Sequence, residues 1–351
     1  MASLRHQAIG TALRMLGALR LDRFAAAGLG GRGVILTFHH VRLATDREFS
    51  ENRLLEVTPS FLENVLRLLR DLDYDLIPLD QVPARLAKEG NERRFAVLTF
   101  DDAYADTRDY ALPILKRYEA PFTVFVVPGF VDRAAPLWWL DLEDVVRARP
   151  GIDLALSTGR VVLPARSPVE KRSAFRQLYW RMRALPEAEM RETIALMAAE
   201  SGVDTMGRVA RLCLDWPALR DFAREPLVTI GAHSLSHPRL RLLPDDAARH
   251  EMAESKARLE REFGRPVKHF AYPVGDRTSA GPREFQMARD LGFETAVTTR
   301  PGVLFPEHGA ALHALPRLSM NGLFQNPDVV RVLLSGLPTG LANRFRRVNA
   351  D

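Results

Sequence analysis

Two carboxylates and two histidines in this sequence have the residue types that a catalytic divalent metal site needs. Asp101 and Asp102 end one short apolar run, and His233 and His237 follow another far downstream. Residues i and i+4 share one face of a helical turn, so both imidazoles can point at a single ion. One carboxylate and two imidazoles can hold a metal with positions left for water, and the second carboxylate can take that water's proton. The pattern therefore predicts a catalytic metal site.

Each half of this pattern has another interpretation when taken alone. An Asp pair after a strand can cap a helix, and residues 107–118 have helical spacing. A lone His-x-x-x-His pair is more often a surface or core feature than a ligand set. The zincin form of the pair has Glu directly after the first histidine, where this chain has Ser234. Because both halves stand at the ends of expected strands, their combination favours the metal site.

Four segments together resemble the motifs of the polysaccharide deacetylases, carbohydrate esterase family 4, which share the NodB homology domain. The segments are Leu36-Thr37-Phe38-His39, Thr99-Phe100-Asp101-Asp102, His233-Ser234-x-x-His237 and Phe270-Ala271-Tyr272-Pro273-Val274-Gly275. The first resembles the histidine segment that usually closes the domain. Its early position is similar to the circularly permuted Phe-Ala-Tyr-Pro branch, which includes poly-N-acetylglucosamine deacetylases. The resemblance covers about residues 34–320.

The resemblance implies hydrolysis of an acetamide on an N-acetylated sugar, with release of acetate from a chitooligosaccharide or an N-acetylglucosamine polymer. By the matching motifs, Asp102, His233 and His237 would hold the metal. Asp101 would be the base for water, and His39 the acid that protonates the departing nitrogen. This ligand set suits Zn²⁺ best, and it also suits Co²⁺, Ni²⁺ or Mn²⁺.

The chain departs from the family motifs in two places. Ala103 stands where the first motif normally has glycine, and alanine enters the left-handed backbone region less easily. Ala271 stands where the third motif normally has an arginine that orients the catalytic aspartate. A carboxylate base needs a partner that positions it and keeps it ionised. We predict that Arg317 takes this place beside Asp101.

Other residues are candidates for contact with the substrate. Trp138 and Trp139 could form a stacking platform for sugar rings, or lie buried beneath a helical insertion. Tyr272 could line the pocket for the acyl group, or fix the turn before Pro273. His40 is the neighbour of the candidate acid, and successive strand residues face opposite ways. We therefore expect His40 to pack against covering helices.

Short apolar runs alternate with segments of helical spacing, which predicts β/α units around a parallel sheet. The runs are residues 34–38, 96–100, 122–127, 227–230, 268–272 and 295–298. Polar motif residues stand at or just after the ends of these runs, as in barrels whose catalytic groups lie at the carboxyl ends of strands. Because fewer than eight runs are clear, we expect an α/β fold in the form of a distorted (β/α) barrel.

The predicted barrel domain spans residues 34–320 and carries a helical insertion at about 130–226, where strand character is scarce. Residues 1–33 are expected to form a basic amphipathic helix that packs on the domain or makes peripheral contact with a membrane. Its apolar residues include Leu13, Leu16 and Leu19. Residues 321–351 are expected to form a basic C-terminal helix or tail.

Composition excludes several classes of function. A net charge of +5 over 351 residues, with no basic stretch interleaved with aromatic residues, argues against a nucleic-acid partner. The single cysteine, Cys213, excludes an internal disulfide and suits a reducing compartment. No apolar run is long enough to span a bilayer, and no signal-peptide pattern is convincing. We expect a cytoplasmic protein, with the periphery of the inner membrane as an alternative.

Two alternative functions remain open at this point. A metal site of this kind could hydrolyse an amide or imide that is not a carbohydrate, since none of the motifs reports the sugar. A weakly active barrel that binds glycans is the other alternative, and Ala103 and Ala271 are the residues that favour it.

Overall fold

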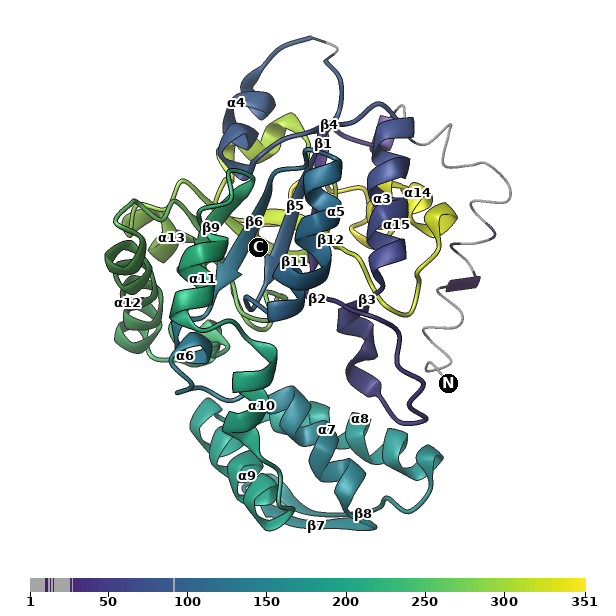
Figure 1. The fold of residues 1–351 in the computed structure, drawn as a ribbon, viewed down its shortest axis with the longest axis vertical. Helices are drawn as coiled ribbons and strands as arrows, with labels where there is room; N and C mark the ends of the chain where they lie inside the picture. Colours follow the sequence, from purple (N-terminus) through teal and green to yellow (C-terminus); the bar gives the residue numbers. More distant parts are fainter. Residues whose placement is uncertain (1–9, 12, 14, 16–25, 27, 91) are drawn as a thin grey trace.

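Seven parallel strands close into a barrel surrounded by helices (Figure 1). The structure is a computed structural model that describes residues 10, 11, 13, 15, 26, 28–90 and 92–351. The order around the barrel is β1-β12-β11-β10-β9-β6-β5, and β5 pairs back with β1. These strands are β1 (Gly33–Phe38), β5 (Phe95–Asp101), β6 (Phe122–Val126), β9 (Val228–Ala232), β10 (His269–Ala271), β11 (Thr295–Pro301) and β12 (Leu315–Ser319). The predicted distorted (β/α) barrel is confirmed.

The sequence did not predict the strand β12. Six of the seven barrel strands coincide with the expected apolar runs, but β12 contains Pro316 and Arg317 within its five residues. Three very short strands lie outside the ring. Two of these, β2 (His40–Val41) and β3 (Glu56–Val57), pair with each other, and β4 (Asp75–Leu76) pairs with the start of β5.

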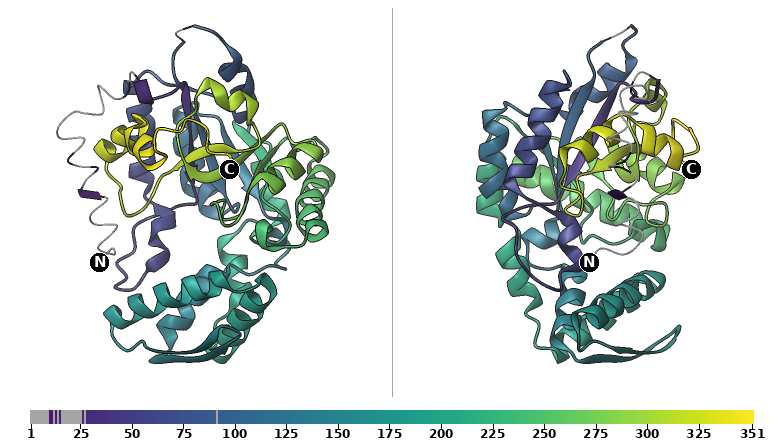
Figure 2. Two further views of the ribbon diagram at one scale, coloured as in Figure 1. Left: turned by 180° about the vertical axis from the view of Figure 1, so that it is seen from behind. Right: turned by 90° about the vertical axis from the view of Figure 1, so that its right-hand side faces the viewer.

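Helices pack around the outside of the barrel (Figure 2). They are α3 (Pro59–Asp71), α4 (Val82–Ala87), α5 (Leu112–Arg117), α6 (Pro128–Val131), α11 (Trp216–Phe222), α12 (Asp245–Phe263), α13 (Pro282–Asp290), α14 (Pro327–Leu334) and α15 (Leu337–Ala342). The start of α3 shows how the local sequence specifies a helix. The Thr58 hydroxyl accepts a hydrogen bond from the amide of Phe61, and Pro59 occupies the first helical position. None of the helices among the described residues is long and apolar enough to cross a membrane.

Alternation along the strands decides which side chains enter the barrel. In β5, Ala96, Leu98 and Phe100 pack outward against the helices, in the cluster that also holds the α3 residues. Val97 belongs to the inner cluster, so Thr99 and Asp101 share the inner face with it. The same alternation in β1 sends Ile35 inward, and His39 follows on that side.

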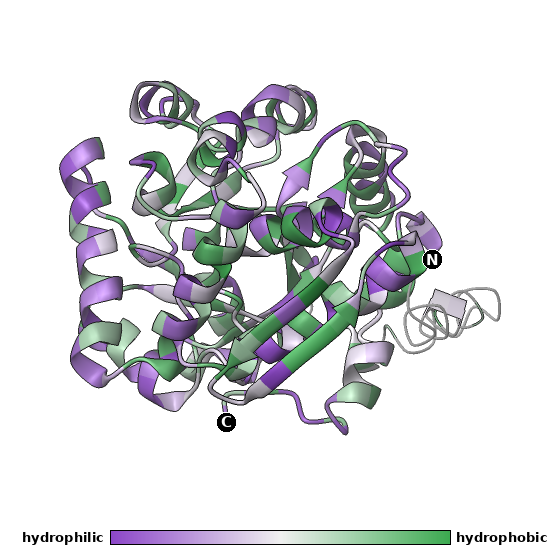
Figure 3. Ribbon diagram, turned by 90° about the horizontal axis from the view of Figure 1, so that it is seen from below, coloured by the Kyte–Doolittle hydropathy of each residue, from purple (hydrophilic) through white to green (hydrophobic). Residues whose placement is uncertain are grey.

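Residues between α6 and α11 form a separate layer below the barrel in Figure 1. The layer contains α7 (Trp138–Ala148), α8 (Pro168–Ala184), α9 (Glu187–Glu200), α10 (Thr205–Leu212) and a hairpin of β7 (Gly151–Leu156) and β8 (Gly159–Pro164). The expectation that this region is helical missed the hairpin. Its residues are mostly exposed or half-buried, and hydrophilic and hydrophobic residues are mixed along it (Figure 3), so no apolar run marks it.

The predictions for the two ends of the chain have different outcomes. Much of the expected N-terminal helix, including Leu16 and Leu19, lies outside the described residues. Leu13 is described, and it is buried against Val329 and Val332 of α14. The C-terminal part is not a simple basic helix, because α14 and α15 are separate and α14 buries most of its apolar residues.

Candidate metal centre and its surroundings

The carboxyl ends of the strands bring the predicted residues together at one mouth of the barrel, which faces the layer of α7 to α10 (Figure 1). His39 follows β1, Asp101 ends β5, and His233 follows β9. Because all barrel strands are parallel, these ends meet at the same rim. Asp102 and His237 lie one and four residues farther along and complete the group.

Three of these residues form a compact candidate ligand set. The Oδ1 atom of Asp102 lies 3.7 Å from the Nε2 atoms of both His233 and His237. One ligand atom from each residue lies within 4.8 Å of the others, and all three residues are buried. The Nδ1 atom of His233 is 2.7 Å from the carbonyl oxygen of Ala271, to which it donates, and this leaves the Nε2 lone pair available.

The residues fit a divalent cation. Oδ1 of Asp102 is buried without a hydrogen-bond partner among the described residues. Burial and then the charge of Asp101 raise the pKa of Asp102 well above its usual value, and a bound cation would offset both effects. Burial lowers the pKa of His233 and of His237, so both imidazoles are neutral, as metal ligands must be.

The two histidines do not share a helical turn, contrary to the expectation from their i, i+4 spacing. They stand on an irregular loop after β9, in which Ser234 and His237 have φ angles of 60° and 63°. The Ser234 hydroxyl accepts a hydrogen bond of 3.0 Å from the His237 amide. Left-handed residues break a helix, so the imidazoles converge through the turn of the loop.

Glu251 of α12 holds this histidine loop. Its carboxylate accepts hydrogen bonds from the amides of Leu235 and Ser236, at 2.9 and 2.8 Å, and from the Ser236 hydroxyl, at 2.7 Å. On the other side, Arg191 of α9 donates to the Ser236 carbonyl oxygen at 3.0 Å. Sequence reasoning missed both residues, because a charged residue on an amphipathic helix gives no local signal of a distant partner.

We expect Glu251→Gln to weaken metal binding by roughly 10- to 100-fold, because an amide cannot accept all three hydrogen bonds and the loop that carries both imidazoles loosens. The measurement is metal affinity by competition with a chelator. Glu254→Gln is the matched control, since Glu254 lies on the same helix and pairs with Arg261 at the surface. Equal affinities in the two variants would show that the loop keeps its shape without this carboxylate.

The backbone after β5 explains why the side chains of two consecutive aspartates both point toward the mouth of the barrel. Successive strand residues face opposite sides, so Asp101 enters the barrel by alternation and Asp102 would not. Asp102 leaves the strand with a φ of 71°, and Ala103 follows with a φ of 51°. The turn brings the Asp102 side chain back toward the histidines. Ala103 therefore adopts the left-handed conformation for which the family uses glycine, at a cost of about 1–2 kcal/mol.

Arg317 binds Asp101 through two parallel hydrogen bonds. Its Nη1 and Nη2 atoms lie 2.8 and 2.7 Å from the two carboxylate oxygens, and both side chains are buried. Arg317 also donates to the Thr298 carbonyl oxygen at 2.9 Å and to the Thr99 hydroxyl at 3.1 Å. The guanidinium thus lies beside Asp101, as predicted from the sequence. It comes from within strand β12 and not from a loop.

The charges around Asp101 keep it ionised. Burial alone would raise its pKa, but the charge and hydrogen bonds of Arg317, together with the nearby His233 and His39, hold the pKa of Asp101 well below its usual value. The Nε2 atom of His39 lies 3.9 Å from Oδ2 of Asp101, and its side chain is 19% exposed. Burial, only partly offset by the Asp101 charge, lowers the pKa of His39 to about 4. His39 is therefore a neutral imidazole beside a carboxylate at the mouth.

Removal of the guanidinium should be costly for the fold. We expect Arg317→Ala to lower the free energy of unfolding by about 3–5 kcal/mol, because it leaves the Asp101 carboxylate buried without a partner. Adding Asp101→Asn should restore part of this loss. The measurement is urea unfolding of Arg317→Ala, of the double variant and of the control Arg224→Ala. The side chain of Arg224 is 80% exposed. A loss as small as that of the control would contradict a structural role for the ion pair.

The aromatic candidates from the sequence lie in the core. Trp138 and Trp139 are 3% and 6% exposed, which agrees with the alternative of burial beneath the insertion. Trp139 packs on the ring of His237, with centroids 4.9 Å apart. Tyr272 is fully buried and donates to the carbonyl oxygen of His313 at 2.9 Å, so its hydroxyl is engaged away from the mouth. Pro273 is also buried.

His40 packs away from the metal centre, as alternation predicts. Its ring stacks on Tyr104 with centroids 3.6 Å apart, and its Nδ1 atom lies 2.7 Å from Oδ2 of Asp106. Tyr104 is a buried neighbour of Asp102, and burial and then the Asp102 charge raise the pKa of its hydroxyl. No motif in the sequence marks Tyr104.

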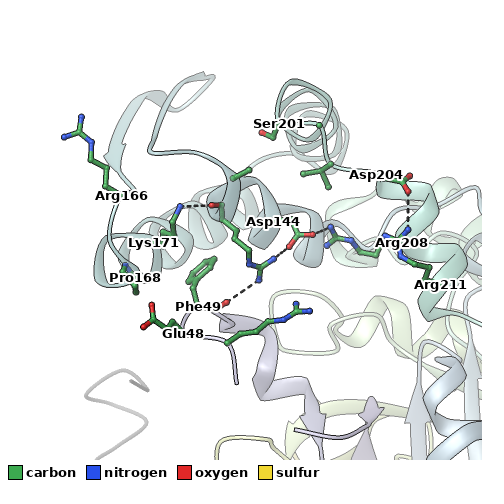
Figure 4. A pocket seen from close by; sticks show the side chains of 15 residues that line it. Glu48, Phe49, Asp144, Arg166, Pro168, Lys171, Ser201, Asp204, Arg208 and Arg211 are labelled. Atoms are coloured by element: carbon green, nitrogen blue, oxygen red, sulfur yellow. Dashed lines mark hydrogen bonds and ion pairs between the residues drawn. The ribbon is translucent and has the colours of Figure 1, made fainter. Parts of the chain in front are cut away.

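A cavity of about 1010 Å³ lies between the insertion and residues 47–49, and not at the metal centre (Figure 4). It is lined by residues of α7, α8 and α10, by residues 201–204 and by residues 47–49, with many cationic side chains. Several of those cations have local partners. Lys171 donates to three carbonyl oxygens at the end of α7, at 2.8 to 2.9 Å, and Asp144 pairs with both Arg147 and Arg208. The cavity therefore gives no separate indication of chemistry.

A parallel barrel with these groups at its mouth defines an α/β-barrel hydrolase. The chain belongs to the polysaccharide deacetylase family, whose model matches residues 88–158 and 175–296. The matched segments include the two aspartates, both ligand histidines and the Phe-Ala-Tyr-Pro segment. Membership makes the protein a deacetylase that acts on amide bonds in carbohydrate.

Solved structures share the fold at low sequence identity. The Streptococcus pyogenes deacetylase PplD, in complex with acetate, is 19% identical over 85% of this chain and 95% of its own, with a TM-score of 0.55. IcaB from Ammonifex degensii is 17% identical over 87% and 97%, with a TM-score of 0.54. BC0361, a polysaccharide deacetylase from Bacillus cereus, is 14% identical over 86% and 68%, with a TM-score of 0.53. No curated protein sequence gives a significant match to this chain.

Proposed function

We propose that this protein is a metal-dependent deacetylase that releases acetate from a chitooligosaccharide or an N-acetylglucosamine polymer. The observation that carries the proposal is the division of the mouth into two parts. Asp102, His233 and His237 converge as a ligand set, while Asp101 is held apart by Arg317. A metal at the ligand set would supply Lewis-acid activation of the acetyl carbonyl and of a water molecule. Zn²⁺ suits the set best, and Co²⁺, Ni²⁺ or Mn²⁺ are alternatives.

The residues around this set divide the proton transfers between them. Asp101 removes a proton from the attacking water as the water oxygen bonds to the acetyl carbon. Arg317 keeps Asp101 ionised and oriented through its two hydrogen bonds. His39, whose Nε2 atom lies 3.9 Å from Asp101, is neutral in the resting site; it takes up the proton that Asp101 removed from water and gives it to the nitrogen as the carbon–nitrogen bond breaks. The products are acetate and a free amino sugar, and the proton taken from water balances the proton delivered to nitrogen.

The geometry around Ala103 and Ala271, the two residues that favoured a weakly active barrel, supports an active site instead. Ala103 adopts the required left-handed conformation, and Arg317 stands beside the base although Ala271 does not provide the family's arginine. An amide or imide hydrolase that acts outside carbohydrate remains the alternative that an assay must separate.

The experiment couples metal analysis with acetate release. Purified protein is analysed for bound divalent metal, and acetate is then measured from N-acetylglucosamine oligomers of increasing length and, in parallel, turnover of simple cyclic imides. We expect about one metal ion per chain and acetate from the oligomers only. Turnover of imides without acetate release from any oligomer would replace the carbohydrate proposal with its alternative.

A further inference from the structure

One aromatic side chain of the insertion is exposed where the others are buried or half-buried. The side chain of Trp180, on α8, is 64% exposed, whereas Trp138 and Trp139 are buried. The fourth tryptophan, Trp216, is half-buried and its indole nitrogen donates to Asp132. An exposed tryptophan presents a large apolar face and a polar N–H group to water, the combination for which tryptophan is enriched at binding interfaces.

A row of aromatic rings connects Trp180 with the metal centre. Trp139 packs on His237 with ring centroids 4.9 Å apart, and Trp138 lies 5.8 Å from Trp139. Tyr179 stacks on Trp138 at 5.6 Å, and Trp180 lies 5.4 Å from Tyr179. The row is buried at the His237 end and exposed at the Trp180 end. Trp180 is thus at the surface but joined by direct packing to the ligand set.

Arg183 connects Trp180 with the loop that follows β10. Its guanidinium carbon lies 5.2 Å from the centre of the Trp180 ring, a cation–π contact. The same guanidinium donates to Asp276 at 2.7 Å and to Thr278 at 2.9 Å. Asp276 directly follows Gly275, the last residue of the third motif segment. The indole is therefore linked to the loop that leaves the mouth of the barrel beside β10.

The surroundings of Trp180 indicate a sugar ring as its ligand. The neighbouring α8 residues Arg176, Gln177 and Arg181 are exposed and polar, so the apolar surface is one indole and not an extended patch. A pyranose ring has an apolar face of C–H groups and an edge of hydroxyl groups. An isolated indole with hydrogen-bonding groups around it matches both parts of such a ring.

We propose that Trp180 forms a sugar-binding subsite, on which the apolar face of a pyranose ring stacks while another residue of the same oligosaccharide is deacetylated at the metal centre. This inference rests on the proposed function and adds to it a preference for longer chains. Because several side chains separate Trp180 from His237, a short substrate occupies the mouth without reaching the indole.

The test compares kinetics across chain length in Trp180→Ala and Trp180→Phe. We expect Trp180→Ala to raise KM about tenfold for long N-acetylglucosamine oligomers, the scale of a lost aromatic contact, with kcat unchanged. The shortest oligomers should be unaffected, and Trp180→Phe should restore most of the loss. Val169→Ala is the matched control, since Val169 is an exposed apolar residue of the same helix.

A binding measurement separates this inference from the proposed function. Tryptophan fluorescence is titrated with a long N-acetylglucosamine oligomer in the Asp101→Asn protein, which should not consume it, with and without Trp180→Phe. A fluorescence change that disappears in the Trp180→Phe protein supports the subsite even if no acetate is ever released. Acetate release with the same chain-length dependence in Trp180→Ala and the wild type overturns the subsite and leaves the deacetylase proposal standing.

Discussion

His237→Ala should remove the metal and the activity together. In the proposed site three side chains hold the ion, and the loss of one leaves only Asp102 and His233 to hold it. We expect metal content to fall from about one ion per chain to near zero after dialysis, and acetate release to fall below detection. Both quantities are measured on the same purified sample, so that loss of metal and loss of turnover can be compared directly.

His250→Ala is the control for this experiment, because His250 is exposed on α12 and lies outside the ligand set. It should keep both metal and activity. Full metal occupancy in the His237→Ala protein would contradict the assignment of His237 as a ligand. Circular dichroism of both variants excludes a general loss of fold as the cause.

Asp101→Asn and His39→Ala should keep the metal and lose turnover. A general base and a general acid act on protons and do not anchor the ion, so each replacement should lower kcat by ~100- to 10,000-fold at unchanged metal content. Asp101→Asn also removes the charge that Arg317 pairs with, and the amide keeps one oxygen as an acceptor. Metal content and kcat are measured together for both variants.

The leaving group distinguishes the two proton-transfer roles. The phenolate of an aryl acetate departs with little help from a proton. His39→Ala should therefore be much less impaired on aryl acetates than on N-acetylglucosamine oligomers. Asp101→Asn should be impaired on both, since both reactions need activated water. Equal losses of His39→Ala on the two substrate types would assign His39 to the scaffold and not to proton donation.

Local patterns in the sequence determined the barrel and most of its mouth. Continuous apolar runs of about five residues are typical of strands buried on both faces, and six of them proved to be barrel strands. Strand alternation also indicated that only one of His39 and His40 faces the site, because it depends only on position along one strand, and the motif match selected His39. These properties arise from neighbouring residues, so they are visible in a single sequence.

Only the tertiary structure decided how the candidate site is held. Closure of the barrel places β12 next to β1, and β1 next to β5. This brings Arg317 of β12 to Asp101 of β5, 216 residues away in the sequence. Glu251 reaches the histidine loop from a neighbouring helix, and the left-handed angles at Asp102 and His237 redirect their side chains. Among the tryptophans, folding buried the adjacent pair and left Trp180 exposed. Each of these outcomes depends on contacts between distant segments, and no local periodicity encodes such contacts.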